Sequence, residues 1–506
     1  MTNDYRPLKS GTDIRGVAVE TEGSPVQLTD EAVYRLTGGF ARFLRELQVA
    51  PGSRIAVGHD SRISASRIKA QVVRALCDAG YCAVDCGLAS TPAMFMTTVD
   101  FDCAAAVQIT ASHHPYDRNG LKFFTRRGGA DSADLDVIIR YAAEPLQATE
   151  EPGSVVTADY MPVYAKRLRN MICSEVNAED YDRPLKGYHI IVDAGNGVGG
   201  FYASQVLAPL GADVSGSQFL EPDGMFPNHA PNPENKQAMD AVSAATVRAK
   251  ADLGIIFDTD VDRASCVDRH GKEINRNRLV ALASVIALEG NEGGTIVTDS
   301  VTSTGLTAFI QDTLGGVHYR YMRGYRNVIN KQLELNAKGV NCPLAIETSG
   351  HAAFRDNYHL DDGAYLITKI VIKLSQMGRD GRDLDALIAA LHDPLEAREI
   401  RLKIRRDDFR SYGNTIIQAL NLAARTQRGW RVANDNREGI RIFFDDPAEN
   451  GWFLLRLSVH DPIIPINIES DAPGGAKRIA AKLLRFLQAF GCLDLSPLRS
   501  FVQSDL

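Results

Sequence analysis

The chain has 506 residues, of which 56 are Lys or Arg and 63 are Asp or Glu, and a formal net charge of −7. At about 100–200 residues per domain, this length predicts three or four domains with ample hydrophobic core. Hydrophobic residues at 44% and charged residues at 24% exclude a disordered or fibrous protein. The mild acidity and the lack of a long Lys/Arg run argue against a nucleic-acid backbone as the main partner.

The N-terminal sequence and the cysteines indicate a cytoplasmic protein. MTNDYRPLKSGTDIRG lacks the apolar core of a secretory signal. No stretch reaches the roughly 18 apolar residues that span a bilayer, so we expect no membrane partner. The eight cysteines are scattered, without C-x-x-C or paired Cys/His spacing, and we expect reduced thiols rather than disulfides or zinc ligands.

In several segments a short β-branched run ends in small or charged residues before a helical stretch begins. The clearest are 54–62, 189–197 and 251–263. Such runs predict buried, mostly parallel strands, because they are nearly continuous apolar stretches with helical segments between them. Ligands in open α/β sheets bind outside the carboxyl ends of the strands, so we expect the chemistry there.

Polar breaks in this pattern predict four domains, which are 1–155, 156–272, 273–390 and 391–506. The first three carry the α/β pattern. In the last, the turn-separated runs GIRIFFDD and GWFLLRLSV precede a closing helix at AAKLLRFLQAF. We therefore expect an α/β protein whose final domain is α+β with an antiparallel sheet.

The stretch ITASHHPYDRNGLKFF at 109–124 contains Ser112, two histidines and Lys122. Its proline and glycine predict that the serine lies on an ordered loop. A serine can be a nucleophile if a base or a metal activates it, and a nearby lysine can stabilise phosphoryl charge or move a proton. An ordinary polar loop with a turn-forming serine is the alternative.

Three aspartates, Asp258, Asp260 and Asp262, alternate directly after the apolar run LGIIF. Carboxylates placed in this way can converge on one hard cation, and Mg²⁺ suits them because it takes oxygen ligands and keeps positions open for a phosphate. A calcium EF-hand is excluded, since Arg263 and Arg269 stand where that loop needs glycine and glutamate. The alternative is a solvated acidic turn.

Two further patterns are weaker. ETSGH at 347–351 follows the run CPLAI and would present Glu347, Ser349 and His351, a cluster suited to sugar hydroxyls, from a strand end. Arg456 and Ser458 in LLRLSVHDP could hold a phosphate. A structural loop and a solvated strand edge are the respective alternatives.

GNGVGG at 195–200 matches the dinucleotide fingerprint G-x-G-x-x-G after a strand, with Asp213 near the distance of a ribose-binding acid. We expect no dinucleotide site, because the motif is short and Asp213 precedes its strand rather than ending it.

Together and in this order, these motifs resemble the α-D-phosphohexomutases, the family of phosphoglucomutase, phosphomannomutase and phosphoglucosamine mutase. The resemblance covers nearly the whole chain and rests on GTDIRG at 11–16, TASHHP with Lys122, GNGVGG, FPNHAPNPEN at 226–235, DTDVDR, ETSGH and the R-x-S phosphate loop. It implies four domains around a central cleft and reversible transfer of phosphoryl between positions 1 and 6 of a mannose or glucose phosphate. The transfer would run through a phosphoserine and a hexose 1,6-bisphosphate, which is both intermediate and activator.

The resemblance also implies a role for each candidate residue. Ser112 would carry the phosphoryl group and bind Mg²⁺ with the three aspartates, and the remaining catalytic residues would be Arg15, Lys122 and His113. The implied substrate-binding residues are Arg263, Glu347, Ser349, His351, Arg456, Ser458 and His460. The partners would be small hexose phosphates, and a monomer and a dimer both stay open.

Some positions depart from the family pattern. ETSGH is similar to the sugar loop of enzymes that accept mannose or both hexoses, and of glucosamine mutases. In the phosphate loop His460 replaces the usual threonine, and His59 occupies a usual arginine position. RGYRNVI at 323–329 replaces the commoner histidine-bearing loop, and its candidate residues are either phosphate or sugar contacts or a strand-to-helix turn: Arg323, Tyr325 and Arg326.

The leading hypothesis is a Mg²⁺-dependent hexose-phosphate mutase. A glucosamine-phosphate mutase, a sugar-phosphate-binding or regulatory protein with poor turnover, and a metal-dependent phosphatase are the alternatives. The intact serine, lysine and aspartates favour catalysis over binding alone. A phosphatase would release inorganic phosphate without forming an isomer.

Overall fold

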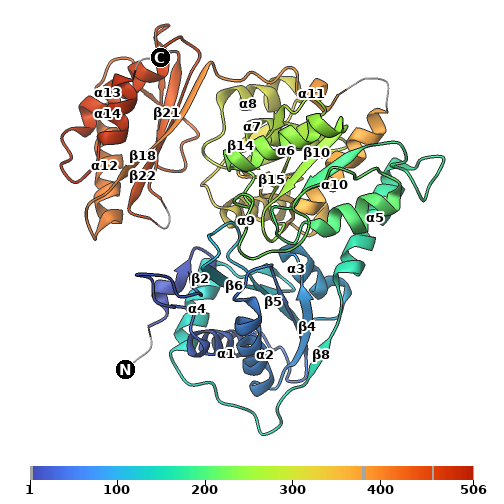
Figure 1. The fold of residues 1–506 in the computed structure, drawn as a ribbon. Helices are drawn as coiled ribbons and strands as arrows, with labels where there is room; N and C mark the ends of the chain where they lie inside the picture. The colour runs from blue at the N-terminus through green and yellow to red at the C-terminus, as the bar shows by residue number, and fades with distance from the viewer. Residues whose placement is uncertain (1–3, 379–382, 459–460, 505–506) are drawn as a thin grey trace. The chain divides into compact units, whose positions relative to one another are not determined.

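The computed structural model describes residues 4–378, 383–458 and 461–504 (Figure 1). Contacts within the chain group the residues into two compact units. One consists of Met1–Asn291 with Cys342–Ala389, and the other of Glu292–Asn341 with Ala390–Leu506. The limits of the four domains stay predictions.

The first unit begins with a mixed sheet in the order β1-β2-β6-β5-β3-β4-β8, blue to cyan in Figure 1, and β7 pairs with β6. As the apolar runs predict, β3 is parallel to β4 and β5, while β6 returns antiparallel to β5. The strands are β1 (Lys9–Ser10), β2 (Asp13–Val17), β3 (Arg54–His59), β4 (Cys82–Leu88), β5 (Ala105–Ile109), β6 (Arg118–Thr125), β7 (Gly128–Gly129) and β8 (Val155–Thr157).

Helices α1, α2 and α4 share one hydrophobic core with this sheet, through Phe40, Val72 and Ile138 among others. The Oγ1 of Thr29 accepts a hydrogen bond from Ala32 N and caps α1, which is how this helix begins. The helices of this part are η1 (Arg6–Leu8), α1 (Asp30–Glu46), α2 (Ala65–Asp78), α3 (Thr91–Asp100) and α4 (Ser132–Ala142).

The second sheet has the order β12-β11-β10-β9, in which β9 and β10 are parallel. All five residues of β10 are buried, so the DTDVDR loop starts at the end of an interior strand. The elements are α5 (Met161–Val176), β9 (Ile190–Asp193), η2 (Tyr202–Leu207), η3 (Ala208–Leu210), α6 (Lys236–Ala249), β10 (Leu253–Phe257), β11 (Ala264–Asp268) and β12 (Glu273–Ile274).

GNGVGG follows β9 and packs against the DTDVDR loop. Val198 N donates to Thr259 O at 2.8 Å, and a Cβ on Gly197 would lie 2.6 Å from the same oxygen, so the glycine permits this close approach. Asp213 bridges to His189, at the amino end of β9 and away from the glycines. The glycine-rich motif therefore supports the aspartate loop.

The remaining strands of the first unit are antiparallel, with β15 paired to β16 and β16 to β17. ETSGH connects β15 to β16, which confirms that it follows a strand. The elements are α7 (Asn277–Leu288), β15 (Leu344–Ile346), β16 (Ala352–Phe354), η5 (Arg355–Asn357), β17 (Leu360–Asp361), α10 (Gly363–Met377) and α11 (Leu384–Leu387).

The second unit contains the parallel pair β13 and β14 and an antiparallel sheet in the order β18-β22-β21-β20-β19. The antiparallel sheet was predicted, and alternate residues such as Ile440 and Ile442 face the core shared with α12, α13 and α14. The elements are β13 (Thr295–Thr298), α8 (Thr304–Ala308), η4 (Phe309–Thr313), β14 (Val317–Arg320), α9 (Tyr325–Ala337), β18 (Glu396–Lys403), α12 (Phe409–Ala424), β19 (Arg431–Val432), β20 (Ile440–Phe444), β21 (Gly451–Leu455), β22 (Ile463–Ser470), α13 (Gly475–Leu487) and α14 (Ser496–Gln503).

Among the helices of the described residues, none has both the length and the apolar character that crossing a bilayer requires.

Candidate active site

Ser112 lies in the turn between β5 and β6 and is almost fully buried. Its backbone has φ of 52°, in the left-handed region that a serine seldom occupies, which is typical of functional loops. The Oγ atom donates to Asp258 Oδ2 at 3.0 Å, lies 3.2 Å from His113 Nδ1, and accepts from Arg263 Nη2 at 3.2 Å. The structure thus brings a hydroxyl, a carboxylate, an imidazole and a guanidinium together.

The three aspartates of DTDVDR are buried, and their oxygens lie within 4.8 Å of one another. Lys122 Nζ donates to Asp260 Oδ2 at 3.3 Å and also to Asp262 Oδ2. Arg263 Nη2 donates to Asp258 Oδ2 at 3.0 Å. Two basic side chains therefore face three carboxylates.

The carboxyl pKa values in this cluster diverge. Burial, with Asp262 nearby, raises the pKa of Asp258 well above its usual range. Burial also acts to raise the pKa of Asp262, but Lys122, His351 and Arg263 outweigh it and lower that pKa. The positive charge of Arg263, together with burial, lowers the pKa of His113 far below that of a free imidazole, which favours the neutral ring beside Ser112 Oγ.

The cluster fits a divalent cation with oxygen ligands. The Oδ1 atoms of Asp260 and Asp262 are buried and have no hydrogen-bond partner among the described residues. A buried carboxylate oxygen without a partner is costly unless a cation or a donor satisfies it. An acidic metal-binding site is therefore present, and its all-oxygen donor set suits Mg²⁺.

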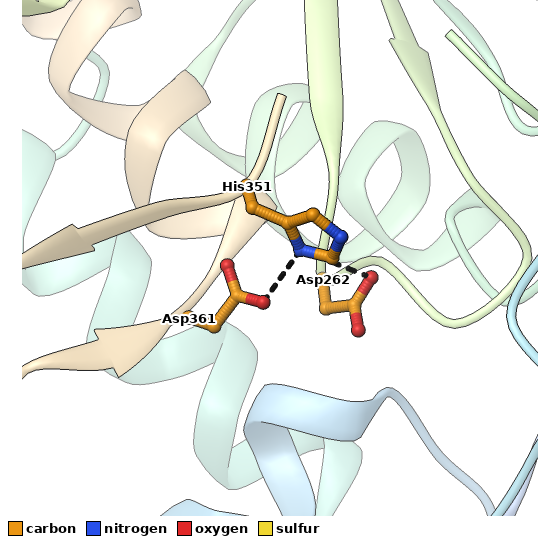
Figure 2. A group of neighbouring side chains, drawn as sticks. All are labelled: Asp262, His351 and Asp361. Carbon is orange, nitrogen blue, oxygen red and sulfur yellow. Dashed lines mark hydrogen bonds and ion pairs between the residues drawn. The ribbon is translucent and has the colours of Figure 1, made fainter. Parts of the chain in front are cut away.

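His351 lies beside these aspartates and is held by Asp361, the first carboxyl of an LDDG sequence (Figure 2). Its Nδ1 is 2.6 Å from Asp361 Oδ2 and 3.9 Å from Asp262 Oδ1. Burial acts to lower the pKa of His351, but Asp361 and Asp262 outweigh it and raise the pKa to about 9. Sequence reasoning missed Asp361, although the two adjacent acids Asp361 and Asp362 at the end of a short strand were a signal for it.

The sugar-loop candidates Glu347 and Ser349 are buried, with Ser349 Oγ donating to Glu347 Oε2 at 3.5 Å. The loop adjoins the aspartate loop, since Arg263 forms a β-bridge with His351. Arg15 pairs with Gly120 across β2 and β6, two residues from Lys122, and its Nη2 donates to Asp13 Oδ2 at 2.7 Å. All these candidates belong to the first unit.

The other candidates belong to the second unit. Arg456 and Ser458 follow β21; Arg456 is buried, and its Nε has no hydrogen-bond partner among the described residues. Burial lowers the pKa of Arg456, and the positive charge of Arg323 lowers it further. RGYRNVI forms the turn from β14 into α9, and Arg323 N donates to Glu438 Oε2 at 3.1 Å.

Tyr325 and Arg326 open α9, and whether they contact substrate stays a prediction. His460 lies outside the described residues.

The sequence analysis did not predict two contacts that position site residues. Asn232 Oδ1, in FPNHAPNPEN, accepts from Arg263 Nη1 at 3.2 Å. Arg62, in the run VGHDSR, donates to backbone oxygens of the Ser112 loop. An arginine in the loop that follows a buried strand was a signal, but its target depends on tertiary structure.

Comparison with known proteins places this arrangement in a class. The chain matches three family models, described as phosphoglucomutase/phosphomannomutase alpha/beta/alpha domains I, II and III, over residues 7–148, 162–271 and 275–394. These matches define a protein of the phosphoglucomutase/phosphomannomutase class.

Similar full-length proteins agree. The phosphomannomutase/phosphoglucomutase of Pseudomonas aeruginosa is 30% identical over 481 residues, which are 94% of each chain. The phosphoglucomutase of Neisseria gonorrhoeae is 28% identical and covers 95% of this chain and 96% of its own. A crystal structure of a phosphoglucomutase/phosphomannomutase family protein from Burkholderia thailandensis is 25% identical, with a TM-score of 0.78 over 97% of this chain and 99% of that one. The chain belongs to the α-D-phosphohexomutase family.

Proposed function

We propose that the protein is an isomerase that reversibly moves a phosphoryl group between positions 1 and 6 of a mannose or glucose phosphate. The observation that carries this proposal is the buried Ser112 Oγ, 3.0 Å from Asp258 Oδ2 and 3.2 Å from Arg263 Nη2. The mannose and glucose mutases among the relatives support this substrate class.

In the forward half-reaction, a phosphoserine at Ser112 gives its phosphoryl group to a sugar hydroxyl. The P–Oγ bond breaks, a P–O bond to the sugar forms, and the hydroxyl proton ends on Ser112 Oγ, with Lys122 as the candidate to relay it and Arg15 as a candidate to stabilise charge. Loose phosphoryl transfer needs positioned positive charge more than covalent assistance. Lys122 and Arg263 supply that charge next to the serine.

In the return half-reaction, Ser112 Oγ attacks the other phosphoryl group of the hexose 1,6-bisphosphate, the P–O bond to the sugar breaks, and the sugar oxygen takes up a proton and leaves as a hydroxyl. The serine proton then has two acceptors within reach, Asp258 Oδ2 at 3.0 Å and the neutral His113 Nδ1 at 3.2 Å. Mg²⁺ held by the three aspartates and the phosphoserine would neutralise charge on the phosphoryl oxygens.

Substrate recognition divides between two groups of residues. Glu347, Ser349 and His351 offer acceptors and donors for sugar hydroxyls. We assign the phosphate that does not react to Arg456 and Ser458, with the neighbouring Arg323, because Arg456 is a buried guanidinium whose Nε has no hydrogen-bond partner among the described residues. Each end of the substrate must occupy both places during one cycle.

The test is a phosphate-position assay of the purified protein with Mg²⁺ and a trace of glucose 1,6-bisphosphate, using mannose, glucose and glucosamine 1-phosphates. Formation of the 6-phosphate from mannose or glucose 1-phosphate is the expected result. Conversion of glucosamine 1-phosphate alone would assign the glucosamine reaction instead. Release of inorganic phosphate without an isomer would indicate a phosphatase, and no conversion by folded, phosphorylated protein would indicate a binding protein.

A further inference from the structure

Arg62 is a buried arginine, with 2% of its surface exposed, in the loop between β3 and α2. It is not among the side chains that hydrogen-bond to Ser112 Oγ in the described residues. Its guanidinium instead contacts the backbone of the serine loop. Nη1 donates to Pro115 O at 2.5 Å and Arg118 O at 2.9 Å, and Nη2 donates to Ser112 O and His114 O. Four carbonyls of one loop thus converge on one side chain.

The fifth donor of the guanidinium fixes its own position. Arg62 Nε donates to Asp60 Oδ2 at 3.2 Å, and the same carboxylate oxygen accepts from Thr110 Oγ1 at 2.7 Å. Thr110 Oγ1 in turn accepts from Ser112 N at 2.9 Å. All five guanidinium N–H groups are therefore used, and both the N–H and the C=O of Ser112 connect to the Asp60–Arg62 pair.

A second loop of the same unit covers this pair. The ring of Phe226 lies over the Arg62 guanidinium at 5.2 Å. A Cβ on Gly224 would lie 2.7 Å from Arg62 Cα, so this loop approaches Arg62 at backbone distance. It continues into Asn232, which accepts from Arg263 Nη1. FPNHAPNPEN therefore contacts two arginines, one bound to the Ser112 carbonyl and the other to its hydroxyl.

We propose that Arg62 is a positioning residue that holds the Ser112 loop in its strained conformation, so that Oγ stays aligned with Asp258 and Arg263. This inference rests on the proposed function of Ser112 as phosphoryl carrier. The left-handed φ of Ser112 is unfavourable for a serine and persists only where surrounding bonds determine it. A displacement of about 1 Å in such a site costs about 10²-fold in rate.

The main variant is Arg62→Lys, which keeps the charge but replaces five planar donors by three on one atom. Its kcat should fall about 100-fold, while KM for the hexose phosphate stays within about threefold, because the sugar and phosphate contacts are elsewhere. Phe226→Leu, which leaves every Arg62 bond in place, should give a smaller loss of kcat. If Arg62→Lys does not fold, Phe226→Leu is measured in its place.

The matched control is Arg67→Lys. Arg67 also donates to backbone oxygens, Ala18 O at 3.0 Å and Leu28 O at 2.9 Å, but among the described residues it makes no hydrogen bond to the 112–118 loop. Its kcat should stay at the wild-type value.

A second readout does not depend on activity. Amide hydrogen exchange of 112–118, including the turn amides of His114 and Arg118, should be at least about tenfold faster in Arg62→Lys than in wild type or Arg67→Lys. Wild-type exchange in this loop, or wild-type kcat, in folded Arg62→Lys would overturn the inference. If wild-type protein converts no hexose phosphate but the loop responds as expected, the proposed function fails and the positioning of the loop by Arg62 stands.

Discussion

The regions around Ser112 and around Arg456 differ in how their basic side chains are hydrogen-bonded. Around Ser112, each basic side chain is hydrogen-bonded to a carboxylate, as Lys122 is to Asp260 and Arg263 is to Asp258. Around Arg456, Glu438 and Arg323 act on the guanidinium in opposite directions, and Arg456 Nε has no hydrogen-bond partner among the described residues. Paired charges suit a place where a phosphoryl group arrives and leaves, whereas a buried guanidinium with an unused donor suits one that holds an anion. Mutations around Ser112 should therefore change mainly kcat, and mutations around Arg456 mainly the affinity for the hexose phosphate.

The largest effect should come from removing the phosphoryl carrier. Ser112→Ala deletes the only atom to which the phosphoryl group is assigned, so kcat should fall by at least about 10⁴-fold. The fold should survive, which a thermal melt checks, and calorimetric binding of hexose phosphate should persist. Turnover within tenfold of wild type would remove Ser112 from its role.

Next in size is the loss of a metal ligand. Asp260→Asn removes one negative charge from the carboxylate cluster, and kcat should drop about 10²-fold while the Mg²⁺ concentration for half-maximal rate rises. Titration of rate against Mg²⁺ measures both. Asp240→Asn, in an exposed pair with Lys236, is the matched control. An unchanged Mg²⁺ response would contradict the ligand assignment.

The region around Arg456 should respond in affinity instead. Arg456→Met should raise KM about 10–100-fold, the equivalent of one lost charge-assisted hydrogen bond, and change kcat by no more than a few fold. Arg431→Met, which breaks an exposed pair with Asp445, is the control and should leave KM as it is. A fall in kcat at constant KM would reverse the division between the two regions.

The smallest effect concerns the pH dependence of stability. Burial raises the pKa of Asp362, which caps α10, to about 6. Because the folded pKa lies above the unfolded one, the folded state binds the proton more tightly, so this group's contribution is fully present at low pH and is lost as pH rises from about 4 to 6. The difference in free energy of unfolding between wild type and Asp362→Asn should change by about 2–3 kcal/mol across that window. Denaturant titrations at several pH values measure it, and a difference independent of pH would refute the shift.

Local sequence is enough to predict many of the strands and the motifs at their ends. The strands ending at Ile109, Phe257 and Ile346 are apolar runs whose carboxyl ends carry polar motifs, and short-range pattern is enough to find both. The antiparallel C-terminal sheet follows from turn-separated alternating runs in the same way.

The contacts that position these motifs do not follow from sequence. Arg62 donates to carbonyls about 50 residues away, whereas Asp361 reaches His351 across the pairing of the neighbouring strands β16 and β17. Gly197 belongs to a sequence that matches a dinucleotide motif, but its close packing against Thr259 is what explains a glycine at this position. Long-range packing decides the contacts of Arg62 and Gly197, and hydrophobic periodicity does not carry that information.

Peptide mass spectrometry of protein incubated with glucose 1,6-bisphosphate and Mg²⁺ tests most directly whether Ser112 carries the phosphoryl group. The account predicts a phosphoryl group on Ser112 that is lost on adding excess glucose 1-phosphate, as glucose 6-phosphate forms. Isomer formation with Ser112 never phosphorylated, or with its phosphate unchanged through many turnovers, would contradict it.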